Sequence, residues 1–260
     1  MDDQPEPARV LHLTDPHLFA DSEASLRGTV TRSSLQSVLN HFQQSAWPAQ
    51  LVAVTGDIIQ DDSREAYERF RAMLQPLGLP VYCVPGNHDV RSLMQEVLSE
   101  PPFYYCAALD VGNWLVAGID SCVSSSAGGC IADAELTRLE NLLGDTGAEH
   151  VMICLHHPPL PMGSRWLDSV GLDNAAEFLD LIAQFPTVRI AVFGHVHQNF
   201  DEMHGGIRIV GTPSTCRQFE PGSIEFAVDQ KPPAYRRFSL HADGRIDDEL
   251  VWLQDATPGA

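Results

Sequence analysis

The chain has 260 residues, of which 44% are hydrophobic, and a formal net charge of −19 at pH 7. This length allows a large buried core in one domain, and the hydrophobic fraction excludes a disordered chain. The acidic balance argues against binding to nucleic acid polymers or to anionic membranes, because both require clustered lysine and arginine.

The ends of the chain and its cysteines indicate a cytoplasmic protein. Residues 1–8 are acidic and contain prolines, unlike a secretory signal, and we expect them to be flexible, as we do residues 255–260. No apolar run reaches the roughly eighteen residues that a membrane span requires. The six cysteines show no CxxC spacing, which is typical of free thiols in a reducing compartment. Residues 9–254 are predicted to form a single domain.

Strands and helices are predicted to alternate along most of the chain. Apolar runs predict strands at residues 9–14, 51–55, 81–84, 151–155 and 190–193, with further strands at 103–107 and 114–119. Apolar side chains at helical spacing predict a helix after the loop 21–28 and helices over 63–74, 92–98, 133–143 and 173–185.

The last quarter of the chain has a different pattern. Residues 207–210, 224–228, 235–240 and 249–253 are predicted to be strands without helices between them. Strand–helix alternation followed by consecutive strands is typical of an α/β sandwich. We expect the second sheet of this sandwich to gain the late strands.

Five of the apolar strands end on residues that can bind metal ions. In chain order, these segments are Asp15-Pro16-His17, Gly56-Asp57, Gly86-Asn87-His88-Asp89, His156-His157 and Gly194-His195-Val196-His197. Ligands beyond the carboxyl ends of strands can converge. A single DxH or HxH segment is weak evidence, but five such segments predict a metal centre with enough ligands for two divalent ions.

Spacing suggests how some of these side chains act together. Asp15 and His17 are two residues apart, as are His195 and His197, so in extended backbone each pair would point the same way and hold one ion. Asp57 could be an anion shared by two cations, which repel each other when they are about 3.5–4 Å apart.

Two further segments each divide into a ligand and a second residue. Neighbours in an extended segment face opposite ways, so we favour His156 as a ligand and expect His157 to support or pack behind it. Asn87 offers a neutral oxygen next to the imidazole of His88, which suits one ligand and one group that faces the substrate. Asn87 could instead be a residue tolerated in a left-handed turn after Gly86.

The ordered series DxH, GD, GNHD, HHPP and GHVH resembles the calcineurin-like metallophosphoesterases. Residues 13–19, 166–168 and 211–216 also resemble segments of the bacterial class III cyclic-AMP phosphodiesterases, so the resemblance extends over about residues 9–243. These additional segments lie outside the ligand motifs and bear on the substrate. The resemblance implies a four-layer α/β/β/α sandwich, with the site at the strand ends between two sheets.

The resemblance also implies a role for each matching residue. One ion would bind Asp15, His17, Asp57 and His197, and the other would bind Asp57, Asn87, His156 and His195. The catalytic residues would be Asn87 and His88, and substrate contacts would come from these two together with His17 and Asp57. Iron or manganese is implied, and zinc or cobalt would also suit imidazole, carboxylate and amide ligands.

The reaction implied is hydrolysis of a small cyclic nucleotide, 3′,5′-cyclic AMP, to 5′-AMP. A hydroxide held between the two ions would attack phosphorus in line with the departing ribose oxygen. His88 would contact the phosphate and stabilise or protonate that oxygen. In the related protein phosphatases, a carboxylate three residues after the bridging aspartate orients this histidine, whereas this chain has Gln60 there and Asp61 one residue later.

Two alternative functions stay open on sequence grounds. The same centre could hydrolyse another small diester, such as a glycerophosphodiester, because the metal motifs do not select the substrate. A catalytically inactive nucleotide-binding regulator is disfavoured, since every expected ligand position is filled. The sequence does not indicate an oligomeric state.

Overall fold

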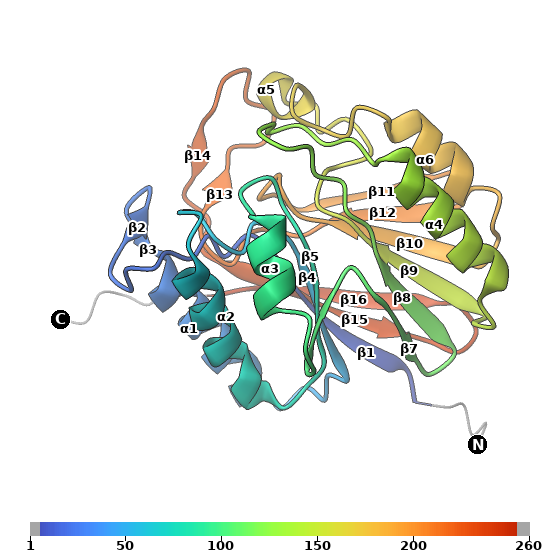
Figure 1. Ribbon diagram of the computed structural model, residues 1–260, viewed down its shortest axis with the longest axis horizontal. Helices are drawn as coiled ribbons and strands as arrows, with labels where there is room; N and C mark the ends of the chain where they lie inside the picture. Colours follow the sequence, from blue (N-terminus) through green and yellow to red (C-terminus); the bar gives the residue numbers. More distant parts are fainter. Residues whose placement is uncertain (1–5, 254–260) are drawn as a thin grey trace.

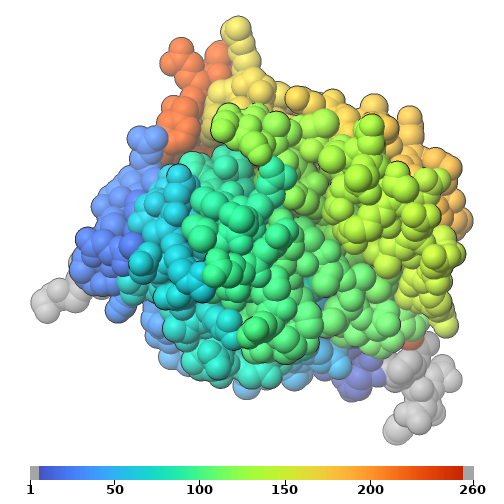
Figure 2. All heavy atoms as spheres, viewed as in Figure 1, coloured from blue at the N-terminus to red at the C-terminus, as the bar shows by residue number. Residues whose placement is uncertain are grey.

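The structure is a computed structural model and describes residues 6–253. Two six-stranded sheets pack face to face, and helices cover the outer face of each (Figure 1). This arrangement confirms the predicted α/β/β/α sandwich. In the space-filling view, the amino-terminal part of the chain (blue to green) fills one side and the middle part (yellow-green to orange) fills the other (Figure 2).

The first sheet has the strand order β16-β15-β1-β4-β5-β6. Its strands are β1 (Ala8–Leu13), β4 (Leu51–Thr55), β5 (Val81–Val84), β6 (Phe103–Tyr105), β15 (Ala234–Leu240) and β16 (Ile246–Trp252). The four neighbouring strands β1, β4, β5 and β6 are parallel, and β15 is antiparallel to both of its neighbours. The outer face is covered by α1 (Thr31–Gln44), α2 (Arg64–Leu74), the 3-10 helix η1 (Gln75–Leu77) and α3 (Arg91–Val97).

The second sheet has the order β11-β12-β10-β9-β8-β7. Its strands are β7 (Ala108–Val111), β8 (Trp114–Gly118), β9 (His150–Cys154), β10 (Val188–Phe193), β11 (Phe200–His204) and β12 (Ile207–Gly211). The four central strands are parallel, and the outermost pair on each side is antiparallel. Its outer face is covered by α4 (Asp133–Asp145) and α6 (Ala175–Ile182).

Small elements occupy the loops of the sandwich. They are the hairpin of β2 (Ser25–Leu26) and β3 (Thr29–Val30), the short helix α5 (Arg165–Asp168), and the pair β13 (Gln218–Phe219) and β14 (Val228–Asp229). The ring of Trp166 packs edge to face against that of Phe219 and joins α5 to β13, and the guanidinium of Arg27 lies over the ring of Phe226. These loops therefore form one connected rim.

The late strands correct one expectation from the sequence. The strand at residues 207–211 joins the second sheet, but β15 and β16 return to the first sheet, because β15 pairs with β1. The strand predicted at residues 224–228 is wrong except for Val228, and Ile224 and Phe226 are exposed in the loop before β14. Apolar residues in this loop therefore face outward instead of filling a sheet.

A core of buried apolar side chains joins the two sheets. Val10 and Tyr82 from the first sheet pack with Trp114 and Met152 from the second, and the hydroxyl of Tyr82 accepts a hydrogen bond from the Gly118 N–H at 2.9 Å.

β1 begins at Ala8, the last residue of the segment expected to be flexible, while residues 1–5 and 254–260 lie outside the described residues. Within residues 6–253, no helix is long and apolar enough to cross a membrane.

Candidate metal centre

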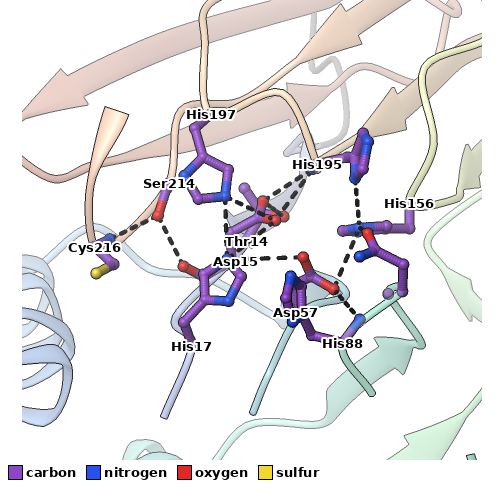
Figure 3. Close-up of polar contacts among 12 residues, drawn as sticks. Thr14, Asp15, His17, Asp57, His88, His156, His195, His197, Ser214 and Cys216 are labelled. Carbon is purple, nitrogen blue, oxygen red and sulfur yellow. Dashed lines mark hydrogen bonds and ion pairs between the residues drawn. The ribbon is translucent and has the colours of Figure 1, made fainter. Parts of the chain in front are cut away.

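The five predicted ligand segments meet between the two sheets (Figure 3). Those from the first sheet follow β1, β4 and β5, and those from the second sheet follow β9 and β10. The side chains buried there are Asp15, His17, Asp57, His156, His195 and His197. Asn87 and His88 are half-buried where the centre opens to the outside, which we call its mouth. We divide the centre into the Asp15 half (Asp15, His17 and His197) and the Asn87 half (Asn87, His156 and His195), with Asp57 between them.

In the Asp15 half, ring nitrogens and carboxylate oxygens converge. The Nε2 atoms of His17 and His197 are 3.1 Å apart, and His197 Nε2 lies 3.3 Å from Asp15 Oδ1. Oδ2 of Asp57 lies 3.7 Å from His17 Nε2. The donor atoms of these residues therefore face a common point.

In the Asn87 half, His156 Nε2 is the central atom. It lies 3.2 Å from Oδ1 of Asn87, 3.2 Å from Nδ1 of His195 and 3.4 Å from Oδ1 of Asp57. Asp57 thus turns one carboxylate oxygen to each half. This is the geometry that a shared anion between two cations requires.

The spacing and protonation of the donors fit two ions. Nitrogen and oxygen ligands about 2.0–2.2 Å from one ion lie about 3–3.5 Å from each other, as most of these atoms do. His156 Nδ1–H donates to the carbonyl of Thr55 at 2.7 Å, and His197 Nδ1–H donates to that of Arg217 at 2.5 Å. A neutral imidazole protonated on Nδ1 has its lone pair on Nε2, the atom that faces the centre in both residues.

Buried charges in the centre compensate each other. Burial by itself raises the pKa of Asp57, but His156 and His17 beside it hold that pKa well below its usual value. Burial lowers the pKa of His156, yet the neighbouring Asp57 and Asp15 outweigh this effect and raise it to about 9. Burial lowers the pKa of His17 to about 4, in spite of Asp57. Without an ion, a proton on His156 therefore balances the carboxylates, and a bound cation would replace it.

The backbone of the ligand segments is not extended, which corrects the geometry expected from the residue spacing. Asp15, His17, Asp57, His195 and His197 have φ angles between 48° and 65°, in the left-handed region. Aspartate and histidine enter this region more readily than most residues with a side chain. The tight turns aim backbone groups as well as side chains, since the His195 N–H donates to the Asp15 carboxylate at 3.1 Å. Asn87, considered for a left-handed turn, has no positive φ.

Glycines let the strand ends approach closely. A Cβ on Gly86 would lie 2.2 Å from Asp57 Oδ1, and a Cβ on Gly194 would lie 2.0 Å from Thr14 Oγ1. Both distances are far inside van der Waals contact. The glycines that precede Asn87 and His195 are therefore required by packing across the centre.

Sequence reasoning missed the residues that support the ligand loops. The carboxylate of Asp89 accepts hydrogen bonds from the N–H groups of Gly86 and Ile58 and from the hydroxyl of Tyr67, at 2.8, 3.1 and 2.9 Å. It thereby ties the loop after β5 to the loop after β4. Burial and the charge of Asp57 raise the pKa of Asp89 to about 7. The only sequence signal was its place at the end of the GNHD motif.

The loop at residues 211–216 also has a structural role that the sequence did not reveal. The Ser214 hydroxyl donates to the Asp15 carbonyl at 2.7 Å, and the Thr215 N–H donates to the Thr14 carbonyl at 3.0 Å. The Thr14 hydroxyl in turn donates to Asp15 Oδ2 at 2.6 Å. The family resemblance connects this loop with the substrate, and these contacts show that it also holds the backbone of Asp15.

The two neighbouring histidines after β9 have different surroundings. His156 enters the centre, whereas His157 Nδ1 lies 2.8 Å from the Ser121 hydroxyl, and the His157 ring lies beside that of His195 with centroids 4.9 Å apart. Burial lowers the pKa of His157 to about 3, so its ring is neutral. His157 therefore packs beside the Asn87 half, and its role as a supporting residue rather than a ligand stays a prediction.

His88 lies where the centre opens to a cleft. The backbone N–H of His88 donates to Asp57 Oδ1 at 2.9 Å. The His88 ring meets that of His17 edge to face, with centroids 5.2 Å apart. A cleft of about 550 Å³ begins at Asn87 and His88 and continues along Arg91 and residues 122–125. Its volume is in the range of small-molecule sites.

On the other side of the centre, aromatic side chains form a wall. The ring of Phe219 stacks on that of His197, with centroids 4.1 Å apart and planes 10° from parallel. Trp166 and Phe226 pack edge to face against Phe219. The wall supports the ring of His197 on one side of the Asp15 half.

Comparison with known proteins agrees with this architecture. A sequence model of the calcineurin-like phosphoesterase family matches residues 8–199. The 3′,5′-cyclic adenosine monophosphate phosphodiesterase CpdA of Pseudomonas aeruginosa is 37% identical over 246 residues, which cover 95% of this chain and 90% of that protein. Its counterpart in Escherichia coli K12 is 36% identical over 248 residues, with the same two coverages.

A solved structure shows the same fold. A dimetal phosphatase from Danio rerio superposes with a TM-score of 0.64 at 17% identity, over 96% of this chain and all of that one. At this identity the likeness concerns the fold alone. The family match extends over most of the chain and includes all five segments that form the centre. The chain therefore belongs to the calcineurin-like phosphoesterase family.

Proposed function

We propose that this protein hydrolyses 3′,5′-cyclic AMP to 5′-AMP with two metal ions held between its sheets. The observation that carries the proposal is the position of Asp57, which turns one oxygen to each half of the centre. Relatives that are 36–37% identical over most of the chain are named as cyclic-AMP phosphodiesterases. We propose residues 9–254 as the catalytic domain.

The residues of the chain hold the ions and the substrate. When bound, the two ions would supply a nucleophile from water and neutralise negative charge on the phosphate oxygens. Asn87 and His88 lie at the mouth, where the phosphate would enter and also contact His17 and Asp57. His88 would donate a hydrogen bond toward the departing ribose oxygen.

The surroundings of the centre support a small anionic substrate. The cleft beside Asn87 and His88 has room for a nucleoside, whereas the net charge of −19 disfavours an anionic polymer. Imidazole, carboxylate and amide ligands without thiolate suit iron, manganese, cobalt or zinc. The family resemblance leads us to propose iron or manganese as the bound ions. All six cysteines are free thiols, which supports a cytoplasmic location.

A panel of diesters tests the substrate. The kcat/KM for cyclic AMP should exceed that for glycerophosphocholine and for bis(p-nitrophenyl) phosphate, and the Asn87→Ala variant, purified in the same way, should reveal any contaminating activity. Elemental analysis of protein purified without added metal should find iron or manganese. A preference for glycerophosphodiesters by orders of magnitude would refute the substrate assignment. Nucleotide binding without turnover of any diester would indicate a regulator instead.

A further inference from the structure

The side chain that faces His88 from behind is an amide and not a carboxylate. Nε2 of Gln60 lies 3.1 Å from Nδ1 of His88. The neighbouring carboxylate of Asp61 is engaged elsewhere, because it accepts hydrogen bonds from the Ala20 N–H at 2.8 Å and from the Ser63 hydroxyl at 2.5 Å. Gln60 is thus the residue that contacts the outer ring nitrogen of His88.

Gln60 is held on a rigid part of the fold. The backbone N–H of Gln60 donates to the carbonyl of Leu18 at 2.8 Å, and the backbone N–H of Leu18 donates to the carbonyl of Ile58 at 2.8 Å. Leu18 and Ile59 form a parallel bridge, and both side chains are fully buried in the core under α1 and α2. The amide is therefore presented to His88 from a fixed backbone.

The direction of this hydrogen bond determines where His88 carries its proton. In this orientation of the amide the Gln60 nitrogen donates, so His88 Nδ1 accepts. A neutral imidazole that accepts on Nδ1 has its proton on Nε2. A ring nitrogen of His88 also lies within 4.8 Å of donor atoms of His17 and Asp57, so the ring reaches from Gln60 to the centre. A carboxylate in place of Gln60 would accept from Nδ1–H and favour the opposite tautomer.

We infer that Gln60 is a positioning residue that fixes His88 as an Nε2–H donor toward the centre. Gln60 does this without touching the substrate, through the tautomer and the orientation of the His88 ring. The consequence for catalysis rests on the proposed function, because the donor is useful where a phosphate and a departing oxygen are bound. The tautomer itself is a property of the protein without metal or substrate.

Nuclear magnetic resonance of the metal-free protein tests the tautomer directly. In ¹⁵N-labelled protein, two-bond correlations should show His88 protonated on Nε2 and bare on Nδ1. Gln60→Leu should abolish this preference, and Gln60→Glu should move the proton to Nδ1. Asp61→Asn is the matched control and should leave the His88 signals unchanged. An Nδ1–H tautomer in the unmodified protein, or an unaltered tautomer in Gln60→Leu, would overturn the inference.

A double-mutant cycle tests whether Gln60 acts through His88. Gln60→Leu should lower kcat for cyclic AMP by about tenfold, as for other residues that orient a functional group, with KM unchanged. In a His88→Ala background, the same substitution should have no further effect. Equal losses in both backgrounds would show that Gln60 does not act through His88. If no diester is turned over, the proposed function fails, and the resonance experiment still decides the role of Gln60.

Discussion

The two halves of the candidate centre differ in charge and in exposure. The Asp15 half has a carboxylate of its own, buried beneath Thr14 and the His195 N–H, in addition to the share of Asp57. The Asn87 half has a neutral amide in the equivalent place, and Asn87 is half-buried beside the cleft. Since two carboxylates attract a cation more strongly than one, we expect a tightly held ion in the Asp15 half and a more exchangeable one in the Asn87 half.

The largest effect should come from removing the residue that the halves share. Asp57→Asn keeps the shape of the side chain but removes the charge that faces both halves. We expect kcat/KM to fall by at least about 100-fold, the size of effect seen when one preorganised electrostatic group is lost. Elemental analysis should find less metal per chain, and anomalous scattering should show the loss in both halves, with Asp61→Asn as the control. Full occupancy of one half in Asp57→Asn would show that the carboxylate is not shared.

Substitutions confined to one half should separate the two ions. His197→Ala removes a candidate metal ligand of the Asp15 half, and Asn87→Ala removes a candidate metal ligand of the Asn87 half. Each should lower kcat by about tenfold or more while circular dichroism shows the fold retained, because each leaves one ion poorly held. Anomalous scattering should show the loss at a different position in each variant. Undiminished hydrolysis in both variants would refute the proposed centre.

The pH dependence of metal binding should also distinguish the halves. In the metal-free protein the pKa of His156 is raised to about 9, so below that pH an ion entering the Asn87 half must displace a proton. Its affinity should therefore rise with pH, by about tenfold per unit between pH 7 and 9. His17, whose pKa is lowered to about 4, is already neutral and adds no such dependence to the Asp15 half. Titration with Mn²⁺ at several pH values measures the metal affinity of each half. An equal change of affinity with pH in the two halves would contradict this prediction.

The smallest effect concerns the support of the Asn87 loop. The hydroxyl of Tyr67 donates to Asp89 and accepts from the Val90 N–H, both at 2.9 Å. Tyr67→Phe should lower the free energy of unfolding in urea by about 1–2 kcal/mol and weaken metal binding in the Asn87 half alone. Tyr104→Phe is a suitable control, because among the described residues its hydroxyl has no hydrogen bond. A stability unchanged from the parent protein would show that Asp89 does not need this hydroxyl.

The sequence predicts the elements that are determined locally. The five apolar strands before the ligand segments lie within a residue or two of β1, β4, β5, β9 and β10, because a strand buried on both faces is a continuous apolar run. The helices at residues 63–74 and 133–143 were found from their apolar spacing and correspond to α2 and α4. The candidate ligands were found because they follow these strands directly.

Features that depend on distant contacts were not predictable in the same way. β15 belongs to the first sheet because Phe238 pairs with Val10, more than two hundred residues away, and nothing in its local pattern identifies that partner. The roles of Asp89 and Ser214 depend on which loops lie next to each other in the fold. The division of ligands between two halves stays a prediction, based on family resemblance and supported by the position of Asp57.

The left-handed backbone at the ligand positions has a consequence for redesigning the metal preference. A new ligand at Asp15, Asp57 or His195 must coordinate the ion and must also tolerate a positive φ, which few residues other than glycine, asparagine, aspartate and histidine do readily. Glutamate and cysteine would supply suitable metal-binding atoms, but neither residue adopts a positive φ readily. A library that varies these positions freely should therefore return functional variants with only a few residue types there. The metal preference will be easier to change at Asn87, which has no positive φ.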